Sequence, residues 1–135
     1  MMITETKIRV RYGETDQMGV VYHGNYALYF EEARTEALRQ IEITYKSLED
    51  EGVMMPVVSL SSEFKRPAKY DDLLTIRTTM KELPTAKITL DYEVFNEQGQ
   101  LLSTGSSTLV FVDMKTNRPT RCPEHLYQKF STFFT

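Results

Sequence analysis

One long helical pattern followed only by strand patterns limits this chain to a small set of folds. From Asn25, apolar residues recur at spacings of three and four, and they are Tyr26, Tyr29, Phe30, Ala33, Ala37, Leu38 and Ile41. This period is typical of an amphipathic helix of about four to five turns. After Pro56 the segments 57–66, 73–81, 88–96 and 101–113 show strand character instead. The sequence therefore predicts an α+β fold in which an antiparallel sheet packs on one long helix.

Shorter patterns complete this prediction. Residues 7–12 alternate between polar and apolar and predict a strand before the long helix. Residues 45–51 predict a short helix ended by Gly52. Pro123 begins a last helix, whose apolar side carries Leu126, Tyr127, Phe130, Phe133 and Phe134. We expect short turns between the four late strands, so that sequential hairpins wrap around the long helix.

Composition restricts the class of protein. The chain has 135 residues, of which 41% are hydrophobic and 26% charged, as in an ordinary globular protein, and we expect one domain over residues 1–135. The net charge of -3 argues against a nucleic-acid binder. Neither a membrane span nor an export signal is predicted. Cys122, the one cysteine, cannot form an internal disulfide and fits a reducing cytoplasm.

The segment 12–26, YGETDQMGVVYHGNY, holds the strongest candidate site. Taken alone, Asp16 is a turn former or a helix cap. However, Gly19 and Gly24 allow the backbone to approach a ligand, and the loop leads into a helix N-terminus with free N–H groups. Such an end stabilises an oxyanion, and a carboxylate opposite it can attack a carbonyl carbon or deprotonate a water. The segment thus favours hydrolysis of an activated acyl group, with a structural loop as the alternative.

Neighbouring residues leave alternatives open. His23 can act as a general acid or base, donate from its ring, or supply its backbone N–H to the oxyanion. Tyr12 either fills core or orients Asp16 or the substrate. Asn25 is predicted to cap the long helix through its side-chain oxygen. The acidic face formed by Glu31, Glu32 and Glu36 is explained by solvent, with a base at a dimer interface as the lesser alternative.

Three cations lie near the end of a predicted strand, namely Lys65, Arg66 and Lys69. They can bind phosphate groups through charge-assisted hydrogen bonds, or they are solvated surface charges. The chain has no Gly-x-Ser-x-Gly motif, phosphate loop or dinucleotide fingerprint. His23 and His125 have no Cys or His companion at metal-ligand spacing. We therefore expect neither a metal nor a cofactor.

At this point the motifs show a likeness to a known family. The segment RVRYGETDQMGVVYHGNYALYFEEARTEALR, together with FKRPAKYDDLLTIRT and LVFVDMKTNRPTRCP, resembles the 4-hydroxybenzoyl-CoA thioesterase family in its branch of bacterial acyl-CoA thioesterases. The resemblance covers nearly the whole chain. It implies the hotdog fold, in which a curved antiparallel sheet of about five strands wraps a long central helix. It also implies a homodimer with sheets joined edge to edge and active sites at the interface, frequently assembled into a homotetramer.

The resemblance further implies an enzyme that hydrolyses an acyl-CoA thioester to a free carboxylic acid and CoA without a cofactor. Asp16 matches the catalytic carboxylate, acting as nucleophile or general base, and His23 matches the position whose backbone N–H polarises the carbonyl. Tyr12 matches a tyrosine common in this branch. Asn25 matches a helix-start asparagine that organises the loop and is placed with Lys65, Arg66 and Lys69 among the substrate-binding residues.

The alternative function is a module that binds acyl-CoA or acyl carrier protein without cleaving it. A hotdog dehydratase is a third possibility, but it needs a second motif flanking a hydroxyacyl carbon, and the sequence shows none. The family includes members that act on different acyl groups and on either donor. The motif therefore does not select a substrate.

Overall fold

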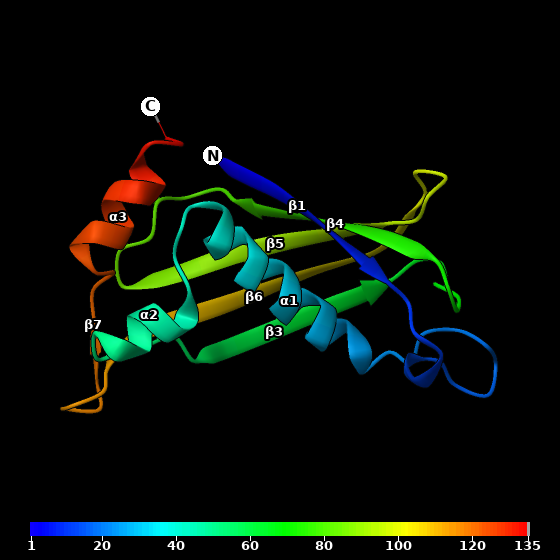
Figure 1. The fold of residues 1–135 in the computed structure, drawn as a ribbon, viewed down its shortest axis with the longest axis horizontal. Coiled ribbons are helices and arrows are strands. Elements are labelled where there is room, and N and C mark those ends of the chain that lie inside the picture. Colours follow the sequence, from blue (N-terminus) through cyan, green and yellow to red (C-terminus); the bar gives the residue numbers. More distant parts are fainter. Residues whose placement is uncertain (135) are drawn as a thin grey trace.

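The structure, a computed structural model that describes residues 1–134, is a curved sheet wrapped around one long helix (Figure 1). In chain order the elements are β1 (Met2–Arg9), a 3₁₀ turn (Tyr12–Glu14), α1 (Asn25–Gln40), α2 (Tyr45–Asp50), β2 (Val53–Met54), β3 (Val57–Phe64), β4 (Leu73–Met80), β5 (Lys87–Phe95), β6 (Leu101–Asp113), β7 (Arg118–Thr120) and α3 (Glu124–Ser131). The predicted α+β class, long helix, four late strands and closing helix are confirmed.

Five long strands form the curved sheet in the order β1-β4-β5-β6-β3, and every neighbouring pair is antiparallel. The short strands β2 and β7 pair with the end of β6. The prediction of sequential hairpins is wrong between β3 and β4, because β3 pairs with β6 and not with β4. Residues 65–72 therefore cross from one side of the sheet to the other at its end, where they meet the loop that precedes α1.

The first strand begins earlier than its apolar pattern indicated. The prediction placed it at residues 7–12, whereas β1 spans Met2–Arg9. Its inward positions alternate with exposed ones, but they include Thr4 and Thr6 between Met2 and Ile8. Because polar residues occupy half of the inward positions, a period-2 apolar signal is absent over this half of the strand.

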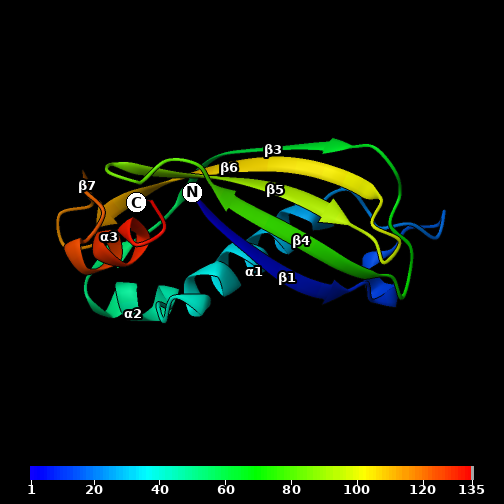
Figure 2. The same ribbon diagram turned by 90° about the horizontal axis from the view of Figure 1, so that it is seen from above.

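Helix α1 lies along the concave face of the sheet (Figure 2). The ring of Phe30 stacks on the ring of Tyr92 in β5, with centroids 4.4 Å apart and planes inclined by 7°. Gly105 in β6 lets Phe30 approach, since a Cβ at this position would lie 2.6 Å from Cζ of Phe30. The hydroxyls of Tyr92 and Ser107 share a hydrogen bond of 2.6 Å. These contacts hold the middle of α1 on β5 and β6.

Strand β3 is covered far less than the rest of the sheet. Strands β4 and β5 alternate between buried and more exposed positions, whereas β3 has no fully buried residue. Val58, Leu60 and Phe64 are 59%, 46% and 53% exposed. One edge of β3 pairs with β6, and its other edge has no partner strand within residues 1–134. An apolar edge strand of this kind is a surface on which another strand can pair.

Candidate active site

A cleft of about 360 Å³ lies between the loop that precedes α1 and the segment that follows β3. Its lining combines an acid, an imidazole, aromatic rings and two cations, from Asp16, Val20, Val21, His23, Tyr26, Phe64, Lys65, Arg66 and Pro67. The volume is within the range of small-molecule sites. Figure 1 shows the loop at the end of the sheet from which α1 starts. The structure thus brings Asp16, His23 and two of the three predicted cations to one cleft.

Backbone hydrogen bonds fold the loop that carries Asp16. The N–H of Asp16 donates to the carbonyl of Val20 at 2.8 Å, and the N–H of Gly19 donates to the carbonyl of Asp16 at 3.0 Å. Gly19 has a φ of +77°, a conformation that favours glycine. The N–H of Val21 donates to the carbonyl of Ala68 at 2.8 Å. This last bond ties the loop to the segment after β3, so the two walls of the cleft are joined.

The Asp16 carboxylate is held by its own loop through one oxygen. Oδ1 accepts hydrogen bonds from the N–H of Met18 at 2.8 Å and from the N–H of Val20 at 3.5 Å. Oδ2 accepts none from the part of the chain that the structure describes, and the residue is exposed to solvent. The orientation of the carboxylate is therefore defined by the backbone while one oxygen remains available to a ligand or a water.

Two backbone amides at the start of α1, those of His23 and Gly24, have no backbone acceptor in the described part of the chain. The N–H of Asn25 donates to Tyr22 and the N–H of Tyr26 donates to His23, whereas the N–H groups of His23 and Gly24 donate to no carbonyl of residues 1–134. Such amides carry the partial positive charge of a helix N-terminus. A Cβ on Gly24 would lie 2.7 Å from the ring of Tyr22, so a glycine accommodates the packing of this turn. Free amides of this kind can stabilise an oxyanion that lies within hydrogen-bonding distance of them.

Aromatic rings form the apolar wall of the cleft. The His23 ring lies 4.3 Å from the Tyr22 ring and 6.3 Å from the Phe64 ring, measured between centroids, and Tyr26 packs edge-on against Phe64 at 5.2 Å. Burial raises the pKa of Tyr26, so its hydroxyl stays protonated at neutral pH. The sequence reasoning missed Tyr26 and Phe64 as lining residues. The signal available for Phe64 was its position directly before the two cations Lys65 and Arg66.

The predicted cations divide between two hollows. The backbone N–H groups of Lys65 and Arg66 both donate to the carbonyl of Leu102, at 2.9 and 3.0 Å, which holds the end of β3 at the rim of the cleft. Lys69 lies outside the cleft and lines a neighbouring hollow of about 340 Å³, to which Arg66 also contributes. Lys65 therefore borders the cleft, Lys69 borders the neighbouring hollow, and Arg66 borders both. We call these three residues the cationic rim.

Glu14, which the sequence reasoning did not single out, connects the elements around the loop. Its Oε1 accepts from the N–H of Arg11 at 2.8 Å and from the Tyr29 hydroxyl at 2.9 Å. Its carbonyl accepts from the N–H of Tyr22 at 2.9 Å and from Nδ2 of Asn25 at 2.8 Å. The prediction that Asn25 caps α1 is wrong, because Gly24 is the N-cap and the Asn25 side chain organises the loop instead. Asn25 does not line the cleft.

Tyr12 lies at the surface rather than in the core. The residue is 77% exposed, and its ring packs edge-on against the ring of Tyr70 with centroids 5.7 Å apart. The interpretation of Tyr12 as a core residue is therefore wrong. Within residues 1–134 its hydroxyl makes no hydrogen bond to Asp16, and Tyr12 is not part of the cleft lining.

Other chemistries find little support in the described part of the chain. Among residues 1–134 no group of three or more His, Cys, Asp or Glu is arranged to hold a metal ion. Burial raises the pKa of the Cys122 thiol to about 12, so this side chain is not a thiolate at neutral pH. No helix within the same residues combines the length and apolar character that crossing a membrane requires.

The fold and the cleft together define the class of protein. A curved antiparallel sheet around a central helix is the hotdog fold, and Asp16 and His23, just before the N-terminus of α1, line one cleft in it. The model of the thioesterase-like superfamily matches residues 10–130, and the chain belongs to this family. The predicted family, fold and enzyme class, a thioester hydrolase, are confirmed.

Individual relatives agree with this assignment. YneP of Bacillus subtilis is 33% identical over 88% of this chain and 86% of its own length. Acyl-CoA thioester hydrolase YbgC of Escherichia coli is 32% identical over 91% of this chain and 92% of its own length. The solved structure of a DHNA-CoA thioesterase from Staphylococcus aureus has a TM-score of 0.93 and 33% identity, covering 99% of this chain and 92% of that chain. The likeness therefore extends over nearly the whole length of each protein.

Proposed function

We propose that this protein is an acyl-CoA thioesterase that hydrolyses an acyl-CoA thioester to a free carboxylic acid and CoA. The observation that supports the proposal is the cleft lined by both Asp16 and His23, since His23 and the following Gly24 have backbone amides without a backbone acceptor within residues 1–134. The printed names of the relatives YbgC and the Staphylococcus aureus enzyme support CoA thioesters as the substrate class.

In the proposed reaction the thioester carbonyl lies between Asp16 and the start of α1. Its oxygen accepts hydrogen bonds from the N–H groups of His23 and Gly24, which stabilise the negative charge as the carbon becomes tetrahedral. Asp16 either attacks this carbon and forms an anhydride that water hydrolyses, or removes a proton from the attacking water. In both routes the C–S bond breaks, and CoA leaves as a thiolate that takes up a proton.

The rest of the cleft supplies contacts for the two ends of the substrate. The Tyr26 and Phe64 rings offer an apolar surface to the acyl group. The rim of Lys65, Arg66 and Lys69 offers charge-assisted hydrogen bonds to the CoA phosphates. The proposed substrate is therefore the class of acyl-CoA thioesters and not one particular acyl-CoA.

The proposal includes a homodimer formed through β3. The uncovered edge and the exposed apolar residues of this strand form a surface that a second copy of the chain can bury. Because Phe64 belongs both to β3 and to the cleft, the partner would complete the cleft wall. Association of two such dimers into a homotetramer is the arrangement that the family resemblance implies.

The substitution Asp16→Asn tests the catalytic role. An asparagine Oδ1 can still accept the hydrogen bond from Met18, so the loop keeps its shape while the nucleophile or base is lost. We expect turnover to fall by roughly three or more powers of ten with an unchanged melting temperature. Asp50→Asn, at the far end of the molecule on α2, is the matched control and retains activity.

The measurement is release of free thiol from a panel of short, long and aromatic acyl-CoAs. Near-normal turnover by the Asp16→Asn protein would contradict the role of this residue. If the unmodified protein released no thiol from any acyl-CoA and the bound thioester were recovered intact, the alternative function of a binding module would replace the proposal.

A further inference from the structure

The loop that carries Asp16 and His23 is closed at its base by one carbonyl group. The carbonyl oxygen of Glu14 accepts a hydrogen bond from the backbone N–H of Tyr22 at 2.9 Å and a second one from Nδ2 of Asn25 at 2.8 Å. Glu14 lies two positions before Asp16 in the chain. Asn25 lies two positions after His23. The two hydrogen bonds therefore join the two ends of the segment that contains both residues of the proposed site.

Inside this closure the segment forms a small hairpin. Thr15 and Val21 pair across it as an isolated antiparallel bridge. Asp16 directly follows Thr15, and its own N–H donates to the carbonyl of Val20 at 2.8 Å. Asp16 is therefore part of the hairpin, so a movement of the hairpin would also move its carboxylate. The hairpin is attached to α1 through the closure at Glu14.

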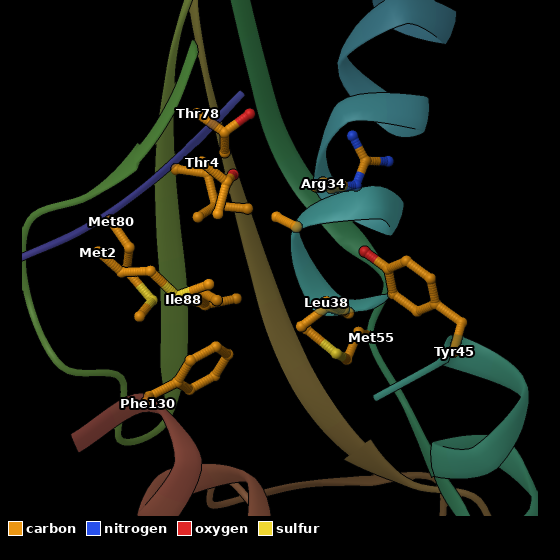
Figure 3. Close-up of a pocket in the computed structure, with 12 residues that line it drawn as sticks. Met2, Thr4, Arg34, Leu38, Tyr45, Met55, Thr78, Met80, Ile88 and Phe130 are labelled. Atoms are coloured by element: carbon orange, nitrogen blue, oxygen red, sulfur yellow. The ribbon is translucent and has the colours of Figure 1, made fainter. Parts of the chain in front are cut away.

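Helix α1, which begins at Asn25, has a fixed place on the sheet. Phe30 stacks on an aromatic ring of β5, and Figure 3 shows Leu38 at the apolar interior, opposite residues of β1, β4, β5 and α3. One turn after Asn25, the Tyr29 hydroxyl donates to the carboxylate of Glu14 at 2.9 Å. Two side chains on one face of α1 thus hold Glu14, one through its carbonyl and the other through its carboxylate. The helix is the support against which the hairpin is held.

We propose that Asn25 is a positioning residue for thioester hydrolysis, an inference that rests on the function proposed above. Within residues 1–134 the cleft lining does not include Asn25, so its side chain acts through the loop and not by contact with the substrate. By holding the Glu14 carbonyl it fixes the Asp16 carboxylate relative to the start of α1. The proposed reaction places the thioester carbonyl between these two parts. A misplacement of catalytic groups by about 1 Å can lower a rate by about a hundredfold.

The substitution Asn25→Ala tests the proposal. The Glu14 carbonyl keeps its hydrogen bond from Tyr22, and alanine is a better helix former than asparagine at the first residue of α1. We therefore expect a melting temperature within about 3 °C of that of the unmodified protein. We expect kcat for an acyl-CoA to fall by roughly 10- to 100-fold, and KM to change by less than about threefold. Thiol release over a range of acyl-CoA concentrations separates the two constants.

The matched control is Gln40→Ala at the other end of α1. Gln40 also donates from a side-chain amide to a main-chain carbonyl, that of Glu5, at 3.2 Å. Because this bond is remote from the loop, the control is expected to keep kcat and KM. Adding Asn25→Ala to Asp16→Asn is expected to change kcat little further, since residues that act as a unit are not additive.

Four results would overturn the positioning role. They are an unchanged kcat in Asn25→Ala, a rise in KM alone, a fall in kcat with a melting temperature many degrees lower, and a full further loss of kcat in the double variant. The second result would make Asn25 a substrate-binding residue, and the third would leave it a purely structural one. In each case the unmodified protein still releases thiol. Absence of thiol release from the unmodified protein would instead overturn the proposed function, and the positioning role with it.

Discussion

At the scale of single residues, Glu14 determines how the loop that carries Asp16 is held. Burial opposes ionisation of its carboxyl, but hydrogen bonds from the Arg11 N–H, the Tyr29 hydroxyl and the Arg11 guanidinium outweigh burial, and the pKa of Glu14 lies below its usual value. Burial and the Glu14 carboxylate raise the pKa of Tyr29 well above its usual value. Over the neutral range Glu14 is therefore an acceptor and Tyr29 a donor, and the contact between them persists.

The substitution Glu14→Gln tests this linkage through the pH dependence of stability. Because the folded-state pKa is below the reference value of 4.5, Glu14 contributes stability above about pH 4.5 that is lost as the pH falls through the lower folded value. We expect the variant to be less stable at neutral pH by about 1–2 kcal/mol, with the difference shrinking in acid. Thermal unfolding between about pH 3 and 7 measures it.

The control for this experiment is Glu49→Gln, an exposed carboxylate on α2. It is expected to match the unmodified protein at every pH. A stability loss in Glu14→Gln that stays constant across the whole pH range would show that the charge of Glu14 is not what holds the loop.

At the scale of elements, the packing of α1 on β6 depends on a glycine in β6, which has no side chain to separate helix and sheet. Gly105 faces the helix, and a Cβ there would lie 2.6 Å from Cζ of Phe30 and 2.9 Å from the carbonyl oxygen of Ser61 in β3. Phe30 is fully buried and stacked on Tyr92, so it has no free rotamer into which it can move. The close approach of helix and sheet is therefore built around this glycine.

We expect Gly105→Ala to destabilise the protein by about 2–3 kcal/mol, because the added methyl group overpacks a filled core. Urea unfolding should show a lower midpoint with an unchanged slope. Gly13→Ala is the matched control, since no atom lies within 4 Å of the Cβ that it would add. An equal midpoint for Gly105→Ala and the unmodified protein would mean that α1 can shift on the sheet at little cost.

At the scale of the whole molecule, the distribution of exposed apolar residues is uneven. Val58, Leu60 and Phe64 are exposed on one strand at one edge of the sheet, whereas the inward residues of β4 and β5 are covered by α1 and by one another. A monomer would leave an unpaired and apolar strand edge in water. This asymmetry is the reason for the proposed dimer through β3.

The substitution Leu60→Lys tests that interface, because it places a charge on the surface to be buried without touching the cleft lining. We expect the unmodified protein to sediment at a mass of at least two 15.7 kDa chains, and the variant to sediment with fewer chains and lower activity. Thr89→Lys, exposed on β5, is the control and leaves the mass unchanged. Sedimentation of the unmodified protein as a single chain at micromolar concentration would exclude the dimer.

The apolar period by itself was sufficient to predict the elements that bury one face. Helix α1 and strands β4, β5 and β6 follow their predicted segments closely, because burial on one side imposes a period of 3.6 or 2 on the residues. The same reasoning failed at the start of β1, where Thr4 and Thr6 face inward. The pairing of β3 with β6 was also invisible, since the pattern of a strand shows which face is buried but not which strand lies beside it.

The candidate site was also predictable from the sequence only in part. Asp16 and His23 were predicted as a pair because they lie in one short loop, so that chain connectivity alone keeps them close. Only the tertiary structure placed Phe64, Lys65 and Arg66 opposite them. Residues separated by about forty positions meet at this cleft because β3 pairs with β6 and the crossing segment bonds to Val21, and neither contact leaves a period in the sequence.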